Sequence, residues 1–202
     1  MLRYPFLPWG KEVDLHSAVW SNGFTLAEIA QIIQLGEAAP LRQGITGSEL
    51  ATGVSYEKAR KSEVSWIEKD AQSEWLYERL ALFARKINSD YFNFELSGFC
   101  EAFQYVVYKS DQQGHHDWHM DKLYHAQGAV QRKLSMVMQL SSPAEYDGGD
   151  LEIFTGGSEF TKCEKELGRI YFFPSWVLHR VTPVTRGTRR ALAIWTHGPT
   201  FR

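Results

Sequence analysis

Residues 118–121, Trp-His-Met-Asp, place an imidazole and a carboxylate two positions apart. Alternate side chains of a β-strand share one face, so His119 and Asp121 are expected to point to the same side of a sheet. A third candidate ligand, His179, follows residues 169–174, a run that is typical of a buried strand. Two histidines and one carboxylate leave coordination positions open, an arrangement typical of non-haem Fe(II) sites. The sequence therefore predicts a metal centre at these three residues.

The same spacing occurs a second time, in His115 and Asp117. The later pair is favoured because aromatic and apolar residues flank it, as expected where a strand enters a closed interior. A glycine precedes the earlier pair and indicates a nearby turn. Three other histidines, His16, His125 and His197, are expected to be ordinary hydrogen-bonded surface or core residues.

Arg189 is the fourth candidate site residue, and it follows His179 beyond a predicted turn at residues 185–188. A buried arginine needs an anionic partner, and its planar guanidinium matches a carboxylate. Two adjacent antiparallel strands would hold the imidazole at the metal and Arg189 deeper in the pocket, where a dicarboxylate would bridge the two. Tyr108, on the strand before the metal strand, is expected to donate to the same carboxylate or, alternatively, to pack in the core.

From residue 100 onward the sequence consists of short runs rich in β-branched and aromatic residues, separated by turn-forming residues. Many short strands at this spacing are typical of an antiparallel β-sandwich or barrel. One turn, Asp147-Gly148-Gly149, predicts a hairpin. The predicted strands are residues 102–109, 115–121, 132–141, 150–154, 168–173, 179–184 and 189–196.

Two helices are predicted in the first half of the chain. Thr25 and Glu28 have the spacing of a capping box, which begins a helix, and Gly36 is placed to end it. The second helix is predicted over residues 73–87, where apolar residues recur at helical spacing.

The order of these elements predicts an α+β fold with helices at the N-terminal side of a mainly antiparallel β core. A further strand is expected at residues 62–67 and a surface loop at 40–60. We expect one domain over residues 1–202, with an N-terminal helical support of about 1–99 and a catalytic core of about 100–202.

The composition is that of a globular protein without a general attraction to polyanions. Its formal net charge of −2 gives no reason to expect nucleic acid or an anionic membrane as a partner. We find no apolar run long enough to cross a bilayer and no pattern of a cleaved signal peptide. Cys100 and Cys163 are too few for a disulfide framework. We therefore expect reduced thiols and a cytoplasmic location, which suits a ferrous site.

Together, these residues resemble the Fe(II)- and 2-oxoglutarate-dependent oxygenases, and specifically their prolyl-4-hydroxylase-like branch. The resemblance covers roughly half of the chain, from Tyr105 to the C-terminus, and its specificity comes from the order of several motifs. In one departure, His116 occupies the position where this branch usually has tyrosine. The matching pieces are Tyr108, residues 118–121, 132–135, 148–151, 173–175, 179–181 and 187–189, and Trp195.

The resemblance implies a double-stranded β-helix, a jelly-roll and cupin-like fold, with supporting helices. It implies Fe(II) on the three predicted ligands, and 2-oxoglutarate on the metal with its distal carboxylate on Arg189, assisted by Tyr108. Val137 and Gln139 are expected to line this pocket. O2 is the second co-substrate, and ascorbate is an optional further cofactor. The implied reaction hydroxylates an unactivated C–H bond of a prolyl residue, amino acid or small metabolite and releases succinate and CO2.

Two alternative functions stay open from the sequence. A nucleic-acid dealkylase of the same fold would flip a base into the pocket, but it should have a basic groove. A non-enzymatic metal-binding β-barrel protein should have a closed site with four ligands, whereas three strong ones are found. Residues 122–131 and 41–61 are expected to be lids over the pocket or, alternatively, solvated loops. The sequence does not indicate an oligomeric state.

Overall fold

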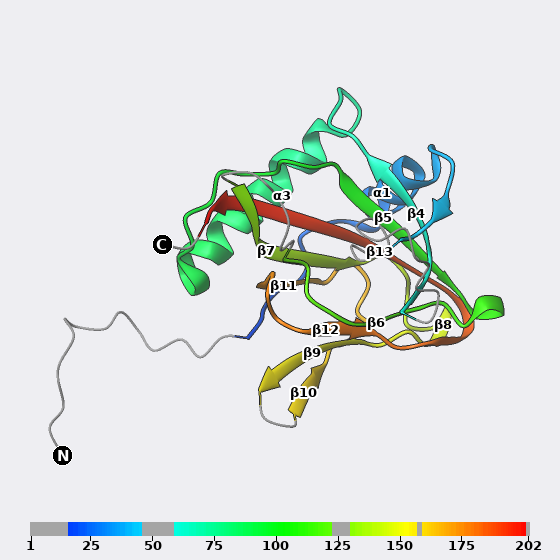
Figure 1. Cartoon of the computed structure of the whole chain (residues 1–202). Coiled ribbons are helices and arrows are strands. Elements are labelled where there is room, and N and C mark those ends of the chain that lie inside the picture. Colours follow the sequence, from blue (N-terminus) through cyan, green and yellow to red (C-terminus); the bar gives the residue numbers. More distant parts are fainter. Residues whose placement is uncertain (1–15, 46–58, 123–129, 157–158, 201–202) are drawn as a thin grey trace, which may run out of the picture.

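The computed structural model describes residues 16–45, 59–122, 130–156 and 159–200. Within these residues, two antiparallel sheets face each other, and two α-helices cover the outer face of the larger sheet (Figure 1). The helices are α1 (Leu26–Glu37) and α3 (Glu74–Ile87), followed by a short π-helix, η1 (Asn88–Phe92). Neither α-helix has the length and apolar character that a membrane-crossing helix requires.

The larger sheet has the strand order β1-β11-β7-β13-β5-β4-β2, and β8 pairs with β13 beside this path. Its strands are β1 (Ala18–Trp20), β2 (Arg42–Gln43), β4 (Glu63–Ile67), β5 (Phe103–Lys109), β7 (Val130–Gln139), β8 (Tyr146–Gly148), β11 (Ile170–Pro174) and β13 (Val184–Pro199).

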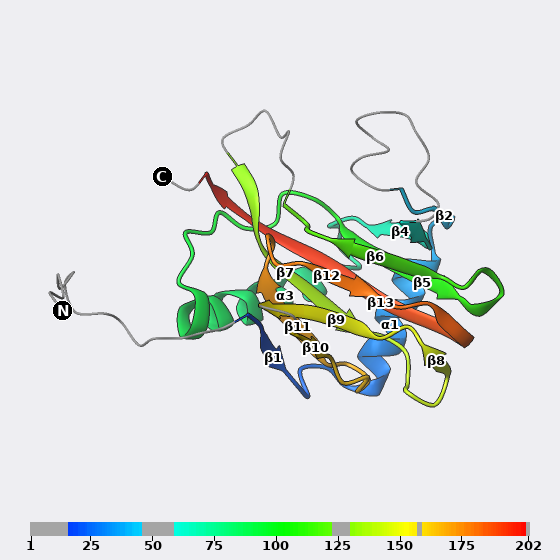
Figure 2. The same ribbon diagram turned by 60° about the horizontal axis from the view of Figure 1, so that its bottom comes forward.

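The smaller sheet has the order β10-β9-β12-β6-β3, and in Figure 2 it lies in front of the larger sheet. A short 3-10 turn, η2 (Ser110–Gln112), leads from β5 of the larger sheet into β6 of the smaller one. The strands of the smaller sheet are β3 (Arg60–Lys61), β6 (His115–His119), β9 (Leu151–Gly156), β10 (Glu159–Lys162) and β12 (His179–Val181).

Two apolar layers hold these elements together. Buried residues of the helices, such as Leu80, belong to one apolar cluster with Phe103 and Leu192 of the larger sheet. A second cluster joins the facing sheets, where Val106 of β5 belongs to the same buried group as Ile153 of β9. Burial of such side chains is the main favourable contribution to folding. The predicted site residues lie between the two sheets, beside this second cluster.

The first helix begins where the sequence predicted, but Gly36 does not end it. The Thr25 hydroxyl accepts from the amide of Glu28 at 3.2 Å, and the Glu28 carboxylate accepts from the amide of Thr25 at 2.8 Å. Gly36, however, lies inside the helix, which ends at Glu37. A Cβ atom at Gly36 would be 2.3 Å from Cγ of Tyr105, so this glycine allows α1 to lie close to the sheet.

Two predicted turns were wrong. The hairpin expected at residues 147–149 does not form, because β8 pairs with β13 whereas β9 pairs with β10 and β12. The chain crosses from one sheet to the other there, with Gly148 at φ +66° against the carbonyl of Pro183. The turn expected at residues 185–188 lies inside β13, where Gly187 adopts φ +71°. His179 and Arg189 therefore lie on different sheets and not on adjacent strands.

The N-terminal half contributes strands as well as helices. Strands β1, β2 and β4 extend the larger sheet, and β3 is an edge of the smaller one. Two of these short strands, β2 and β3, fall at the ends of the predicted surface loop. The lids expected at 122–131 and 41–61 lie largely outside the described residues.

Candidate metal centre

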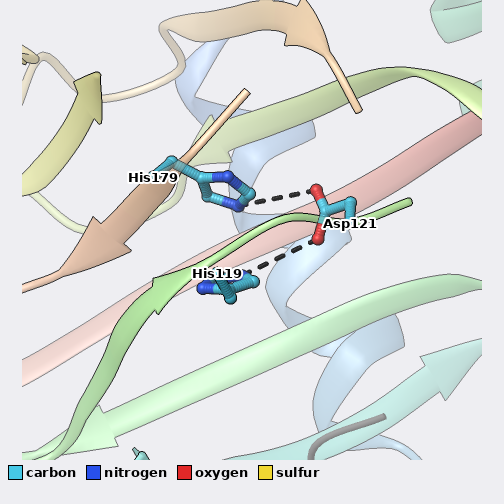
Figure 3. A group of neighbouring side chains, drawn as sticks. All are labelled: His119, Asp121 and His179. Atoms are coloured by element: carbon cyan, nitrogen blue, oxygen red, sulfur yellow. Dashed lines mark ion pairs between the residues drawn. The ribbon is translucent and has the colours of Figure 1, made fainter. Parts of the chain in front are cut away.

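The three predicted ligands converge where the smaller sheet faces the larger one (Figure 3). His119 at the end of β6 is paired directly with His179 at the start of β12. The chain then continues to Asp121, whose two carboxylate oxygens face the imidazoles. Nε2 of His119 lies 3.7 Å from Oδ1, and Nε2 of His179 lies 3.5 Å from Oδ2. The donor atoms all lie within 4.8 Å of one another, close enough to share one ion.

Each imidazole is oriented by a carbonyl two residues earlier in its own chain segment. Nδ1 of His119 lies 2.7 Å from the carbonyl oxygen of Asp117, and Nδ1 of His179 lies 3.0 Å from that of Val177. With its hydrogen on Nδ1, each ring donates to the carbonyl and keeps a lone pair on Nε2. Both lone pairs then face the centre, as expected for metal-binding histidines.

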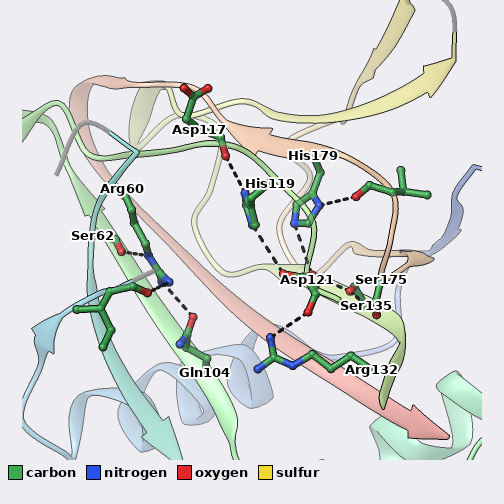
Figure 4. Close-up of polar contacts among 12 residues, drawn as sticks. Arg60, Ser62, Gln104, Asp117, His119, Asp121, Arg132, Ser135, Ser175 and His179 are labelled. Atoms are coloured by element: carbon green, nitrogen blue, oxygen red, sulfur yellow. Dashed lines mark hydrogen bonds and ion pairs between the residues drawn. The ribbon is translucent and has the colours of Figure 1, made fainter. Parts of the chain in front are cut away.

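The carboxylate of Asp121 is also held in place. It is 9% exposed, and its Oδ2 accepts from the hydroxyl of Ser135 at 2.7 Å. Ser135 lies 3.0 Å from Ser175, and Arg132 donates to the backbone carbonyl of Asp121 at 3.4 Å (Figure 4). These contacts fix both the side chain and the backbone of the candidate ligand.

The protonation states suit metal binding. Burial opposes ionisation of Asp121, but the two imidazoles and the Ser135 hydroxyl outweigh it and lower the pKa of this carboxyl. Burial, together with neighbouring His179, lowers the pKa of His119 to about 3. The centre therefore offers an ionised carboxylate and a neutral imidazole at neutral pH.

Arg189 lies between the sheets, on β13, and is 1% exposed. Its Nη2 donates to Oε1 of Gln139 at 3.1 Å, and its guanidinium lies 5.3 Å from the ring centre of Tyr108. No carboxylate among the described residues forms an ion pair with it. Its Nε and the Nε2 of Gln139 are buried without hydrogen-bond partners there. A buried cation with free donors calls for an anion, so these residues fit a bound carboxylate.

The alternative pair, His115 and Asp117, is not part of the cluster. Nδ1 of His115 lies 2.8 Å from the carbonyl oxygen of Gln113, and the carboxylate of Asp117 accepts from the amide of Trp118. His197 is buried against Glu101, as expected for a core histidine.

Two residues near the centre have contacts that the sequence did not indicate. Ser135 alternates with Val137 and Gln139 along β7, so the two-residue period of that strand would have placed it on the same face. His116, which replaces the usual tyrosine, stacks on His119 with ring centres 3.5 Å apart. Burial is the largest contribution lowering the pKa of His116, so this ring is neutral.

Two nitrogens and one carboxylate oxygen on one side of an ion suit Fe(II) and leave positions for further ligands. The oriented lone pairs and the buried carboxylate fit this metal. The donor set would equally accept other divalent ions that prefer such ligands, so family evidence bears on the choice.

Comparison with known proteins supplies that evidence. Residues 103–197 match the model of the 2OG-Fe(II) oxygenase superfamily. A PKHD-type hydroxylase of Synechococcus sp. (strain CC9311) is 34% identical over 103 residues, which are 50% of this chain and 46% of that protein. A PKHD-type hydroxylase of Teredinibacter turnerae is 46% identical over 68 residues, 33% of this chain and 29% of that protein. The aligned stretch thus spans less than half of either relative.

Solved structures resemble the fold over most of the chain. A Pseudomonas putida prolyl-4-hydroxylase gives a TM-score of 0.68 at 18% identity and covers 92% of this chain and 94% of its own. A Trichoplax adhaerens prolyl hydroxylase in complex with a hypoxia inducible factor peptide gives a TM-score of 0.71 at 16% identity. The match covers 90% of this chain and 83% of that one. These similarities confirm the double-stranded β-helix with supporting helices. The chain is therefore similar to the 2OG-Fe(II) oxygenase superfamily over residues 103–197, and it has the double-stranded β-helix fold of the prolyl-4-hydroxylase structure.

Proposed function

We propose that this protein is an Fe(II)- and 2-oxoglutarate-dependent dioxygenase that hydroxylates an unactivated C–H bond and releases succinate and CO2. The observation that carries the proposal is the pairing of two sites. His119, Asp121 and His179 gather their donors within 4.8 Å, and buried Arg189 lies between the same two sheets without a carboxylate partner among the described residues. A dicarboxylic keto acid is the ligand class that would satisfy both.

Each residue has a stated part in this proposal. His119, Asp121 and His179 would hold Fe(II), and Ser135 would keep the carboxylate in position. Arg189 and Gln139 would bind the distal carboxylate, and Tyr108 would form the wall beside the guanidinium. The bound metal supplies oxygen activation, while the protein orients the ligands and excludes water.

The names of the similar proteins indicate a broad class of substrates. The similar proteins are named prolyl hydroxylases and PKHD-type hydroxylases, and one is described with a peptide. We propose a peptide with a prolyl residue, a free amino acid or a small metabolite as substrate. We also propose ascorbate as a stimulating reductant, to be tested by omission from the same assay.

We further propose that the chain forms one domain and works in the cytoplasm. Each sheet contains strands from both halves of the chain, with those of the N-terminal half towards the edges, which supports a single folding unit. Both cysteines, Cys100 and Cys163, are free thiols, as in reducing compartments.

The test is a turnover screen with 2-oxoglutarate and Fe(II) against amino acids, proline-containing peptides and nucleotides, measured as substrate-stimulated succinate release. Asp121→Ala should abolish succinate formation because the proposed ligand set loses its carboxylate. Asp117→Ala is the matched control and should keep turnover, since its exposed carboxylate lies outside the cluster. Full activity of Asp121→Ala would contradict the proposed ligand set.

A further inference from the structure

Three buried polar groups around Arg189 make no hydrogen bond of good geometry to any of the described residues. They are Nε of Arg189, Nε2 of Gln139 and the hydroxyl of Tyr146. All three side chains are 1% exposed. Buried polar groups are nearly always paired, and an unpaired one destabilises the fold. Three such groups around one cation indicate that a ligand completes this pocket.

The backbone brings Tyr146 and Arg189 together. Tyr146 on β8 pairs with Gly187 on β13, two residues before Arg189. Gly149, at φ +59°, lies against both side chains: a Cβ atom there would be 3.0 Å from Cδ of Arg189 and 3.2 Å from Cε2 of Tyr146. The connection from β8 to β9 therefore holds the ring of Tyr146 close to the aliphatic part of the Arg189 side chain.

The other contacts in the pocket leave its donors free. Oε1 of Gln139 accepts from Arg189, which leaves the amide Nε2 of Gln139 to donate elsewhere. Nζ of Lys165 lies 4.5 Å from the ring centre of Tyr146 and pairs with Asp150 at 3.0 Å. Burial raises the pKa of Tyr146 although Arg189 opposes this, so the hydroxyl carries its proton at neutral pH. All three orphan groups can thus donate.

We propose that Tyr146 donates a hydrogen bond from its hydroxyl to the distal carboxylate of the keto-acid co-substrate, beside Arg189 and Gln139. This inference rests on the proposed function and adds a binding residue that the sequence did not indicate. A carboxylate has two oxygens that accept several hydrogen bonds and a charge that balances the guanidinium. Water molecules could accept from these donors but would not balance the charge of the guanidinium.

The test compares two tyrosine variants of the full chain loaded with Mn(II), which permits binding of 2-oxoglutarate without turnover. Tyr146→Phe should raise the Kd of 2-oxoglutarate roughly tenfold in calorimetry, the effect of one hydrogen bond to a charged group. Its free energy of unfolding without co-substrate should stay equal or increase, because the variant removes a buried hydroxyl that has no partner.

Tyr171→Phe is the matched control. Tyr171 is also buried in the layer between the sheets, but its hydroxyl already donates to the carbonyl of Glu164 at 3.1 Å. This variant should show the opposite pattern: a lower stability and an unchanged Kd.

Two outcomes would overturn the inference. Equal affinity of the wild type and Tyr146→Phe would show that the hydroxyl does not contact the co-substrate. A loss of stability in Tyr146→Phe as large as in Tyr171→Phe would show a structural hydroxyl. If the wild type binds no 2-oxoglutarate, the proposed function itself fails, which is a distinguishable result.

Discussion

The residues of the candidate metal centre differ in how far the sequence reveals them. His119 and Asp121 are detectable because their spacing matches the period of a strand, and His179 because it follows a buried run. Ser135 shares the face of β7 that the two-residue period indicates, whereas the position of Tyr146 beside Arg189 depends on the pairing of β8 with β13. A sequence without pairing information cannot supply that part of the site.

We predict that Ser135→Ala weakens metal binding about 10- to 100-fold, because Asp121 loses the hydrogen bond that orients it. Titration with Mn(II) or anaerobic Fe(II) measures the effect. Ser141→Ala is the control: this buried serine contacts Thr188 and Arg190 and should leave metal affinity unchanged. Equal affinity of Ser135→Ala and the wild type would show that the hydroxyl has no orienting role.

At the scale of elements, long periodic segments were predicted well and connections were not. The second helix, expected at 73–87, is observed at Glu74–Ile87, and the strand expected at 102–109 is observed at Phe103–Lys109. Glycines at 36, 148 and 187 were interpreted as helix ends or turns. Each instead allows a close approach between backbone and a distant segment, which local sequence does not encode.

We predict that Gly36→Ala destabilises the protein by about 1–3 kcal/mol. Alanine favours a helix over glycine by about 1 kcal/mol, but the added Cβ would overlap the ring of fully buried Tyr105. Unfolding by urea measures the difference. Gln34→Ala, at an exposed position of the same helix, should change stability by less than about 0.5 kcal/mol. An unchanged midpoint for Gly36→Ala would contradict the predicted overlap.

For the whole molecule, the α+β class was predictable and the complete strand order was not. Strands β1, β2 and β3 have two or three residues each, too few for a periodic pattern, yet they extend both sheets. Charge pairs also join distant parts: Glu101 binds Arg132 of β7 and His197 of β13.

Glu101 predicts how stability depends on pH. Burial opposes its ionisation, but His197 and Arg132 outweigh burial and lower its pKa from 4.5 to about 2. Because the folded pKa lies below the unfolded one, the stabilisation is present above pH 4.5 and is lost as the pH falls towards 2. The wild type should lose up to about 3 kcal/mol over this range.

Glu101→Gln should lack this contribution, so its unfolding free energy should depend less on pH between 4.5 and 2. Denaturation at several pH values measures this. Glu145→Gln, at an exposed position, should follow the wild type. If the unfolding free energies of Glu101→Gln and the wild type depended on pH in the same way, the effect could not be assigned to Glu101.

Metal binding should stabilise the folded chain as a whole, since the three ligands come from segments that meet only in the native state. At a metal concentration 100 times the Kd, the expected gain is about 2.7 kcal/mol. Thermal unfolding with and without anaerobic Fe(II) should show a higher Tm for the wild type and for Asp117→Ala. A similar rise in Asp121→Ala would show that the metal binds elsewhere.

The spacing of the two facing sheets limits the length of the dicarboxylic acid that the pocket can bind. The three candidate metal ligands lie on or beside the smaller sheet and Arg189 lies on the larger one, so a diacid bound at both would have to span the distance between the sheets. Facing sheets are spaced at about 10 Å, and their packed layer resists compression. The distance between the sheets would then select the length of the diacid. A diacid one methylene shorter or longer would bind at one sheet and fail to reach its partner on the other.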